Sequence, residues 1–199
     1  MYDIIGVVFQ SRRNHSLEGQ LQRLERYEKP VGWSEGVPRL IWGIWFVFFS
    51  PLLSAHWLPG CAWRVMLLRL FGAEIGCYCR IKPGLRVKFP WRLKVGDYCW
   101  LAQDAWIDNQ APVIIGDRVC ISQGAYLCTG NHDFRSPNFD LCLGPISIGS
   151  EAWIAARAVL APGTVIGPGA VVALGAVVSG TVPARAIMRG NPAVQVGDR

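Results

Sequence analysis

The sequence lacks several marks of secreted and metal-dependent proteins. Its seven cysteines show no zinc-binding or thioredoxin-like spacing, since a single residue separates Cys77 from Cys79. Residues 1–15 contain no basic region followed by an apolar core and a small-residue cleavage site, so we expect a cytoplasmic protein with reduced thiols. There is no Gly-x-Ser-x-Gly motif and no cluster of metal ligands. We therefore expect no covalent serine intermediate and no metal.

The sequence also has no apolar run long enough to span a bilayer. The uncharged run from Leu40 to Ala55 is shorter than the roughly 20 residues that a span needs, and it contains Pro51. A second apolar stretch, Cys61–Phe71, is typical of an amphipathic helix whose two arginines snorkel or face solvent. We expect residues 1–72 to form a helical cap that packs on the protein itself or lies against a membrane surface.

Charge is scarce and of mixed sign. Only 17% of the 199 residues are charged and 51% are hydrophobic, which is typical of a single folded domain and not of a disordered chain. The one concentration of charge lies at residues 80–94, which contain six cations and no acid. Such a cluster is either a solvated face or a surface for phosphate, an anionic membrane or nucleic acid. We expect no nucleic-acid partner.

What the sequence does contain is a six-residue repeat. From Ile75 to Val182 an aliphatic residue recurs at six-residue intervals, and a small residue often follows four positions later, as Ala152 follows Ile148. Three repeats make an 18-residue coil in which both residues point inward. The sequence therefore predicts a mainly β protein: a β-helix at residues 73–183 with a tail at 184–199. Five coils would form a prism on the order of 24 Å tall.

An insertion interrupts the third coil. The step from Ile115 to Ile148 exceeds one coil by 15 residues, which predicts a loop at residues 133–147. His132 lies at the root of this loop, whereas His15 and His56 have no such setting. A neutral imidazole can take the proton of an attacking hydroxyl, so His132 is either a general base or a surface residue in a turn.

The length of a coil predicts which residues lie next to the root of the loop. One coil back lie Asp108 and Asn109, and Asp108 either contacts a substrate or fills the acidic position of the repeat. Ala155, Ala173 and Asn191 are spaced by 18 and are predicted to form an outward column. Such a column makes a groove for an extended ligand, or serves the wall alone. We expect the imidazole and this groove to share one wall.

These residues resemble the hexapeptide-repeat acyltransferases over about residues 67–194. The likeness is closest to exopolysaccharide O-acetyltransferases of the colanic-acid type, which are related to maltose and galactoside acetyltransferases. It depends on LRLFGAEIG (68–76), IDNQAP (107–112) and ISQGAYLCTGNHD (121–133). The resemblance implies a left-handed parallel β-helix with an N-terminal helical cap, a homotrimer with sites between subunits, and acetyl-CoA as acyl donor.

The resemblance also assigns roles by position. It implies that His132 is the general base for attack of a hydroxyl on the thioester. The residues implied near the acceptor are Asp108, Asn109, Asn131 and Asp133. Asn109 stands where maltose-type enzymes carry an acid, and Ala102 where they carry an asparagine, so acceptor binding is expected to differ. The residues implied for coenzyme A are Trp153, Ala155, Ala156, Ala173, Leu174, Ser179, Arg185, Arg189 and Asn191, with the arginines meeting its phosphates.

Three functions stay open at this point. The first is acetylation of a sugar or polysaccharide precursor by direct transfer, with contact at the inner membrane face as a hypothesis. The second uses a small free acceptor such as a sugar nucleotide, an amino sugar or a xenobiotic. The third is a non-catalytic β-helix that serves as an assembly module and tolerates loss of His132. A carbonic anhydrase of the same fold is nearly excluded, because two of the three histidines lie outside the repeat.

Overall fold

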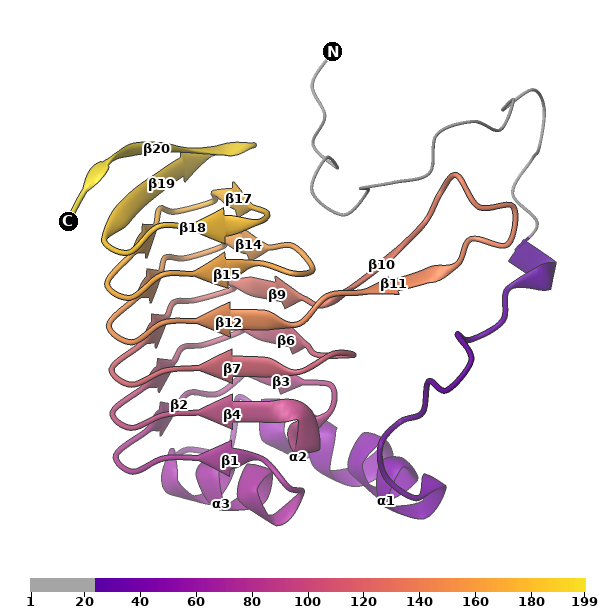
Figure 1. Cartoon of the computed structure of the whole chain (residues 1–199). Helices are drawn as coiled ribbons and strands as arrows, with labels where there is room; N and C mark the ends of the chain where they lie inside the picture. Colours follow the sequence, from indigo (N-terminus) through magenta and orange to yellow (C-terminus); the bar gives the residue numbers. More distant parts are fainter. Residues whose placement is uncertain (1–23) are drawn as a thin grey trace.

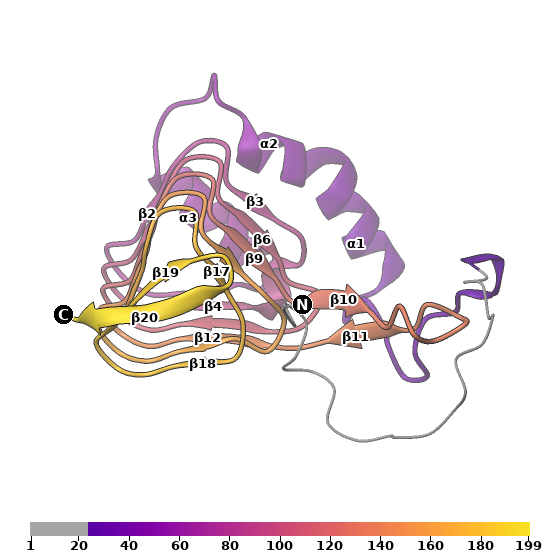
Figure 2. The same ribbon diagram turned by 90° about the horizontal axis from the view of Figure 1, so that it is seen from above.

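A computed structural model describes residues 24–199; residues 1–23, with His15 and the first part of the predicted cap, lie outside the described residues. The described chain forms a triangular prism with helices at one end (Figure 1). Seen along its axis, the prism has three walls, each a mainly parallel sheet (Figure 2). The predicted mainly β parallel helix with an N-terminal helical cap is therefore confirmed.

The walls receive one strand each from successive coils. We name them in chain order. Sheet A contains β1 (Glu74–Ile75), β4 (Leu93–Val95), β7 (Val113–Ile115), β12 (Ile146–Ile148), β15 (Val165–Ile166) and β18 (Thr181–Val182). Sheet B contains β2 (Arg80–Ile81), β5 (Trp100–Leu101), β8 (Cys120–Ile121), β13 (Trp153–Ile154), β16 (Val171–Val172), β19 (Ala186–Gly190) and β20 (Ala193–Asp198). Sheet C contains β3 (Arg86–Val87), β6 (Trp106–Asp108), β9 (Tyr126–Cys128), β14 (Val159–Leu160) and β17 (Val177–Val178).

The core is the stack of inward aliphatic and small side chains that the repeat predicts. Ile148 and Ile166 are 2% and 1% exposed and pair in register between β12 and β15. Ala152 is equally buried, so the small residue of each repeat fills a corner of the triangle. Cys99 is also buried, and desolvation raises the pKa of its thiol to about 11. Cys99 is therefore a residue of the core.

The upper end differs from the prediction. Sheet A has six strands and not five, and β19, within the predicted tail, adds a parallel strand to sheet B before β20 folds back antiparallel on it. Val165 pairs with Thr181, a step of 16 residues and not 18. The turn from β17 to β18 contains only Ser179 and Gly180, and Gly180 adopts a φ of +76°, which permits this tighter corner.

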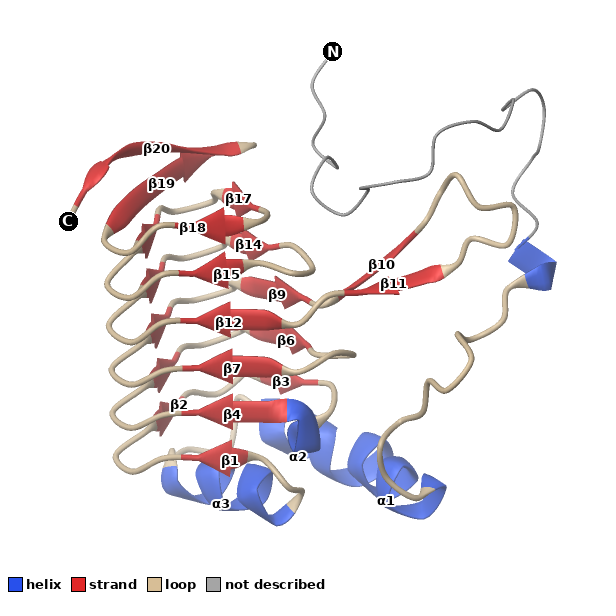
Figure 3. Cartoon of the chain, viewed as in Figure 1, coloured by secondary structure: helices blue, strands red, loops and turns tan. Residues whose placement is uncertain are grey.

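The cap lies below the first coil (Figure 3). Aromatic side chains hold it there. A turn, η1 (Leu24–Arg26), is followed by the apolar stretch α1 (Arg39–Ile44), η2 (Trp45–Phe49) and α2 (Ser50–Ser54), and then by α3 (Ala62–Leu70). Trp45 and Phe49 each pack on Phe71, with ring centroids 5.0 and 4.9 Å apart. No helix of residues 24–199 is long and apolar enough to cross a membrane.

Arg64 in α3 corrects the prediction that the arginines of this helix snorkel or face solvent. Its side chain is fully buried. The guanidinium donates to the carbonyl oxygens of Leu53, Ala55 and Leu58, at 3.1, 2.7 and 2.7 Å. It therefore satisfies the backbone of the loop between α2 and α3, which has no strand partner. Burial lowers the pKa of Arg64 from its ordinary value.

Candidate active site

His132 lies on a β-hairpin that leaves the prism at the corner between sheets C and A. The hairpin pairs β10 (Gly130–His132) with β11 (Leu141–Leu143) and projects away from the stack (Figure 1). At its base the Gly144 N–H donates to the Thr129 carbonyl oxygen at 2.9 Å. Thr129 is fully buried, and its hydroxyl donates to the Asp108 carbonyl oxygen at 2.9 Å. The hairpin therefore starts from a fixed point of the rigid stack.

The imidazole of His132 is held in one tautomer. Its Nδ1 lies 2.8 Å from the carbonyl oxygen of Phe139, and because a carbonyl only accepts, Nδ1 must carry the hydrogen. In the neutral ring the unprotonated nitrogen is then Nε2. The Phe139 ring stacks on the imidazole at 4.3 Å, and the Tyr27 ring meets it edge-on at 5.5 Å. The arrangement presents a nitrogen that can accept a proton.

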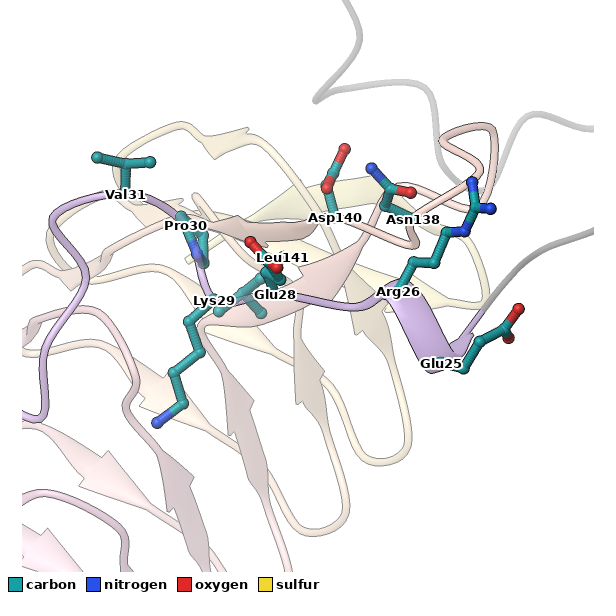
Figure 4. A pocket seen from close by; sticks show the side chains of 9 residues that line it. All are labelled: Glu25, Arg26, Glu28, Lys29, Pro30, Val31, Asn138, Asp140 and Leu141. Atoms are coloured by element: carbon teal, nitrogen blue, oxygen red, sulfur yellow. The ribbon is translucent and has the colours of Figure 1, made fainter.

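A cavity of about 850 Å³ opens beside the hairpin. His132 and Leu141 are paired across the hairpin and so point to the same face, and Leu141 lines the cavity. Asp140 and Asn138 add polar groups from the loop (Figure 4). The opposite wall is made by residues 25–31, which bring both carboxylates and cations. Such a polar lining suits a ligand with many hydroxyl groups.

The opposite wall belongs to a segment that the sequence did not reveal as part of a site. We call residues 24–37 the strap. Trp91 donates its indole N–H to the Glu35 carbonyl oxygen at 2.6 Å, and Arg92 donates to that of Ser34. The ion pair of Lys29 with Glu35, 2.8 Å long, lowers the pKa of the Glu35 carboxyl. The turn η3 (Pro90–Arg92) of the first coil thus holds the strap across the face of the hairpin.

Asp108 lies one coil below the hairpin root, as the spacing predicts. It pairs with Cys128 between β6 and β9. Its carboxylate lies 2.9 Å from the Lys88 ammonium and accepts the Tyr126 hydroxyl at 3.3 Å. Burial, with the neighbouring Cys128 and Asp108, raises the pKa of Tyr126, so the phenol stays a donor at neutral pH. The Asp108 carboxylate is therefore fixed in position, and the Lys88 ammonium offsets part of its negative charge.

Other acceptor-side candidates have different positions from those expected. Asn109 is fully buried and its amide exchanges two hydrogen bonds, of 2.9 and 2.7 Å, with the backbone of Phe89. Both polar groups of this buried amide are engaged by the backbone, and they hold a turn of the first coil. Asn131 pairs with Cys142, on the hairpin face opposite to that of His132. Asp133 accepts the N–H of Arg135 at 2.9 Å, which holds the start of the loop.

Ala155 and Ala173 form a column, but Asn191 does not belong to it. The N–H groups of Ala155 and Ala173 donate to Val172 and Met188, in the next coil up, at 2.9 and 2.8 Å. Because the last coil is two residues short, Val172 pairs with Met188 and the residue beyond Ala173 is Arg189. Asn191 lies in the turn between β19 and β20. We call Ala155, Ala173 and Arg189 the donor column.

The remaining donor-side candidates divide among three corners of the prism. Ala156 and the exposed Leu174 adjoin the donor column, between sheets B and C. Trp153 points outward from sheet B, half exposed, and its indole N–H donates to Ser122 Oγ at 2.9 Å. Ser179 follows sheet C, and Arg185 lies between sheets A and B, where it bonds the Arg199 carbonyl oxygen. The structure therefore does not bring Ser179 and Arg185 to the column.

One chain does not bring the imidazole and the donor column together. The hairpin leaves at the corner between sheets C and A, whereas the column lies at the corner between sheets B and C (Figure 2). The width of sheet C separates them, so the expectation of a shared wall is wrong for the single chain. Within residues 24–199 no group of three or more His, Cys, Asp or Glu side chains is placed to hold a metal.

Comparison with known proteins gives relatives over most of the chain. No family model matches. An Escherichia coli K12 protein that bears the name of a colanic acid biosynthesis acetyltransferase, WcaF, is 38% identical over 90% of this chain and 98% of its own length. Nodulation protein L of Rhizobium leguminosarum bv. viciae is 36% identical over 69% of this chain and 74% of its own.

Solved structures share the fold. A hexapeptide-repeat acetyltransferase of Vibrio cholerae, complexed with acetyl coenzyme A, superposes with a TM-score of 0.68 at 24% identity, over 75% of this chain and 84% of its own. A galactoside acetyltransferase in complex with coenzyme A superposes with a TM-score of 0.66 at 20% identity, over 80% and 78% of the two chains.

Proposed function

Since the chain belongs to the hexapeptide-repeat acetyltransferases, by its 38% identity to almost the whole of the E. coli relative, we propose that it moves acetyl from acetyl-CoA to a hydroxyl of a sugar or polysaccharide precursor. His132 serves as the general base. The observation that carries this role is the 2.8 Å contact of Nδ1 with the Phe139 carbonyl, which leaves Nε2 to receive a proton.

The chemistry is a direct transfer. As the acceptor oxygen attacks the thioester carbonyl carbon, Nε2 of His132 takes the hydroxyl proton, a contribution of about 10²–10⁴ in rate. The new C–O bond replaces the C–S bond, and the proton passes from the imidazolium to the leaving thiolate. The positive charge that forms on the ring strengthens the Nδ1–H bond to the Phe139 carbonyl oxygen. No side chain needs to be acylated.

The donor column fits an extended coenzyme A arm. Ala155, which is 5% exposed, and the half-buried Ala173 present small side chains over which the arm can run, and Arg189 follows them with an exposed guanidinium suited to a phosphate. Trp153 and Leu174 supply exposed apolar surface beside the column. Acetyl-CoA and coenzyme A in the solved relatives support the same donor here.

A homotrimer with sites between subunits reconciles the two halves of the site. Within one chain the hairpin projects away from its own prism at one corner while the donor column lies at another (Figure 2). A neighbouring copy brings its column to the projecting hairpin. His132 of one subunit then faces Ala155 and Ala173 of the next, and the three-walled prism allows the arrangement to close after three copies.

The acceptor lies between the strap and the hairpin. The cavity there is lined by Leu141, which pairs with His132 across the hairpin, and Glu25, Glu28 and Asp140 offer carboxylates for hydroxyl groups. The colanic acid biosynthesis name of the E. coli relative supports an exopolysaccharide precursor as acceptor, in the cytoplasm or at the inner membrane face. A sugar nucleotide, amino sugar or xenobiotic is the alternative acceptor, and a non-catalytic assembly module is the alternative function.

Thiol release from acetyl-CoA with a panel of sugars, sugar nucleotides and glycan oligomers tests the proposal. We expect His132→Ala to lose about 10²–10⁴ of the rate with an accepted acceptor. His56→Ala is the matched control, since His56 is exposed and both it and its partner Asp104 lie far along the chain from the hairpin. Equal activity of wild type and His132→Ala would refute the role of His132, and no thiol release with any acceptor would favour the assembly module.

A further inference from the structure

We propose that the cap end of the prism docks on an anionic lipid surface and that a groove beside Arg86 receives a lipid phosphate there. This turns the general hypothesis of membrane contact into a defined surface and a defined headgroup site. Docking is independent of the transfer chemistry, because neither His132 nor the donor column takes part in it.

The helical stretch of α1, η2 and α2 is apolar on all sides, but within the described part of the chain it is packed on only one. Trp45 and Leu53 are fully buried against the first coil, whereas Leu40, Val47 and Phe48 are 73%, 65% and 66% exposed. A helix that is hydrophobic all round is ordinarily buried on every side. Its outer face therefore calls for a partner.

The same end of the molecule carries further exposed apolar residues. Trp57, between α2 and α3, is 78% exposed. Met66 and Leu70, four residues apart and so on one face of α3, are 69% and 76% exposed. Figure 1 shows the three helices gathered at one end of the stack. The apolar surface is thus much larger than a single exposed side chain.

Charge identifies the partner as an anionic lipid surface. Residues 36–73 contain no acid, and of their three arginines Arg39 and Arg69 are exposed whereas Arg64 is buried. Arg39 at the start of α1, and Arg80 and Arg86 on the first coil, are exposed and form no ion pair within residues 24–199. An apolar face flanked by cations and tryptophans is typical of an element that lies in a membrane interface. A second copy meeting this face would place like charges together.

A groove of about 420 Å³ lies between the helical stretch and sheet C. Ser50 and Ser54 line it from one side, and Arg86 and Lys88 from the other. Lys88 is paired with Asp108, whereas among residues 24–199 the contact of the Arg86 guanidinium is with the face of the Trp106 ring, 4.3 Å from its centroid. Stacking uses the flat face of a guanidinium and leaves its N–H edge for a phosphate.

The groove and the apolar face belong to the same helical stretch. Ser50 lies two residues beyond Phe48, so side chains that enter a bilayer and hydroxyls that line the groove are close neighbours. When Val47 and Phe48 insert, the groove comes to the depth of the lipid headgroups. A headgroup phosphate fits both the depth of the groove and the N–H edge of the Arg86 guanidinium.

Flotation of the full-length protein with vesicles of phosphatidylcholine, with and without phosphatidylglycerol, tests the proposal. We expect binding only to the anionic vesicles, weakening with salt. Val47→Glu with Phe48→Glu should reduce binding more than about tenfold, and Arg86→Gln about fivefold. Val165→Glu with Val196→Glu, at exposed positions in β15 and β20, and Arg157→Gln should leave binding unchanged.

Several results would overturn the proposal. Docking is overturned if the wild-type protein does not bind anionic vesicles, or if the Val47/Phe48 variant binds them as well as the wild type does. The phosphate groove is overturned if the Arg86 variant binds as well as the wild type. A smaller sedimentation mass of the Val47/Phe48 variant without lipid would show that a second copy covers the face. Circular dichroism confirms folding of each variant. Thiol release with a soluble acceptor should be unchanged in all of them, so that failure of docking and failure of acetyl transfer are separate results.

Discussion

Gly144 closes the hairpin at a position where a larger residue does not fit. It follows β11, and its N–H donates to the Thr129 carbonyl oxygen. A Cβ at this position would lie 2.3 Å from the Gly163 nitrogen and 2.7 Å from the Pro162 carbonyl carbon, both of them backbone atoms of the next coil. Backbone of a packed coil does not give way like a flexible side chain. Gly144→Ala must therefore displace the hairpin base by about 1 Å.

This displacement has two expected consequences. Overpacking of this kind costs about 1–3 kcal/mol, which for a chain of this size lowers Tm by roughly 2–4 °C for each kcal/mol. A shift of about 1 Å at the root of His132 costs up to about 10²-fold in rate. Thermal unfolding and thiol release from acetyl-CoA measure the two effects on the same preparation.

Gly43→Ala is the matched control. Gly43 lies in α1 without a left-handed backbone, and a Cβ added there would meet no neighbouring atom within 4 Å. The same substitution at this position should stabilise the protein by about 0.5–1 kcal/mol, because alanine loses less conformational entropy in a helix. A Gly144→Ala protein with wild-type Tm and activity would refute the argument, as would a Gly43→Ala protein that is equally damaged.

Three further predictions follow from the strap, the core and the donor column. Trp91→Phe removes the hydrogen bond that anchors the strap, so kinetic measurements should show a higher KM for the acceptor with little change in that for acetyl-CoA. Alkylation at pH 8 followed by peptide mass mapping should label the exposed Cys77 and spare Cys99, whose pKa of about 11 leaves about one thiolate in a thousand. Arg189→Gln should raise the KM for acetyl-CoA several-fold and Asn191→Ala should not, since the short last coil places Arg189 in the column; the reverse result would contradict the assigned register.

The sequence predicts those features of the fold that the repeat itself dictates. A period of six fixes which side chains point inward, so the burial of Ile148 and Ile166 and the pairing of Asp108 with Cys128 follow from counting. The position of His132 at the loop root follows in the same way. Counting by 18 failed in the last coil, where the corner between β17 and β18 is two residues shorter. The tighter turn at Gly180 leaves the inward side chains in place, but it shifts by two residues which positions pair with the coil below.

The strap escaped prediction for a different reason. It is fastened through backbone carbonyls, those of Ser34 and Glu35, and a carbonyl oxygen has no residue-type signature. The donors, Trp91 and Arg92, are more than 50 positions away in the sequence and carry no motif. Asn109 is the opposite case: its residue type and position pointed to a site, but both of its amide groups form hydrogen bonds with the backbone of Phe89.

The division of the site between a rigid stack and two attached segments has a consequence for specificity. On the proposed mechanism the donor column belongs to the stack, whose coils are fixed by the inward ladder, whereas the acceptor cavity is made by the strap and the hairpin. The hairpin joins the stack through Thr129 and Gly144, and the strap through the turn that carries Trp91. Replacing residues 24–37 and 131–142 with those of a relative should therefore change which acceptor is acetylated while the KM for acetyl-CoA stays constant. A chimera that loses acetyl-CoA binding would show that the two sites share more structure than these joints.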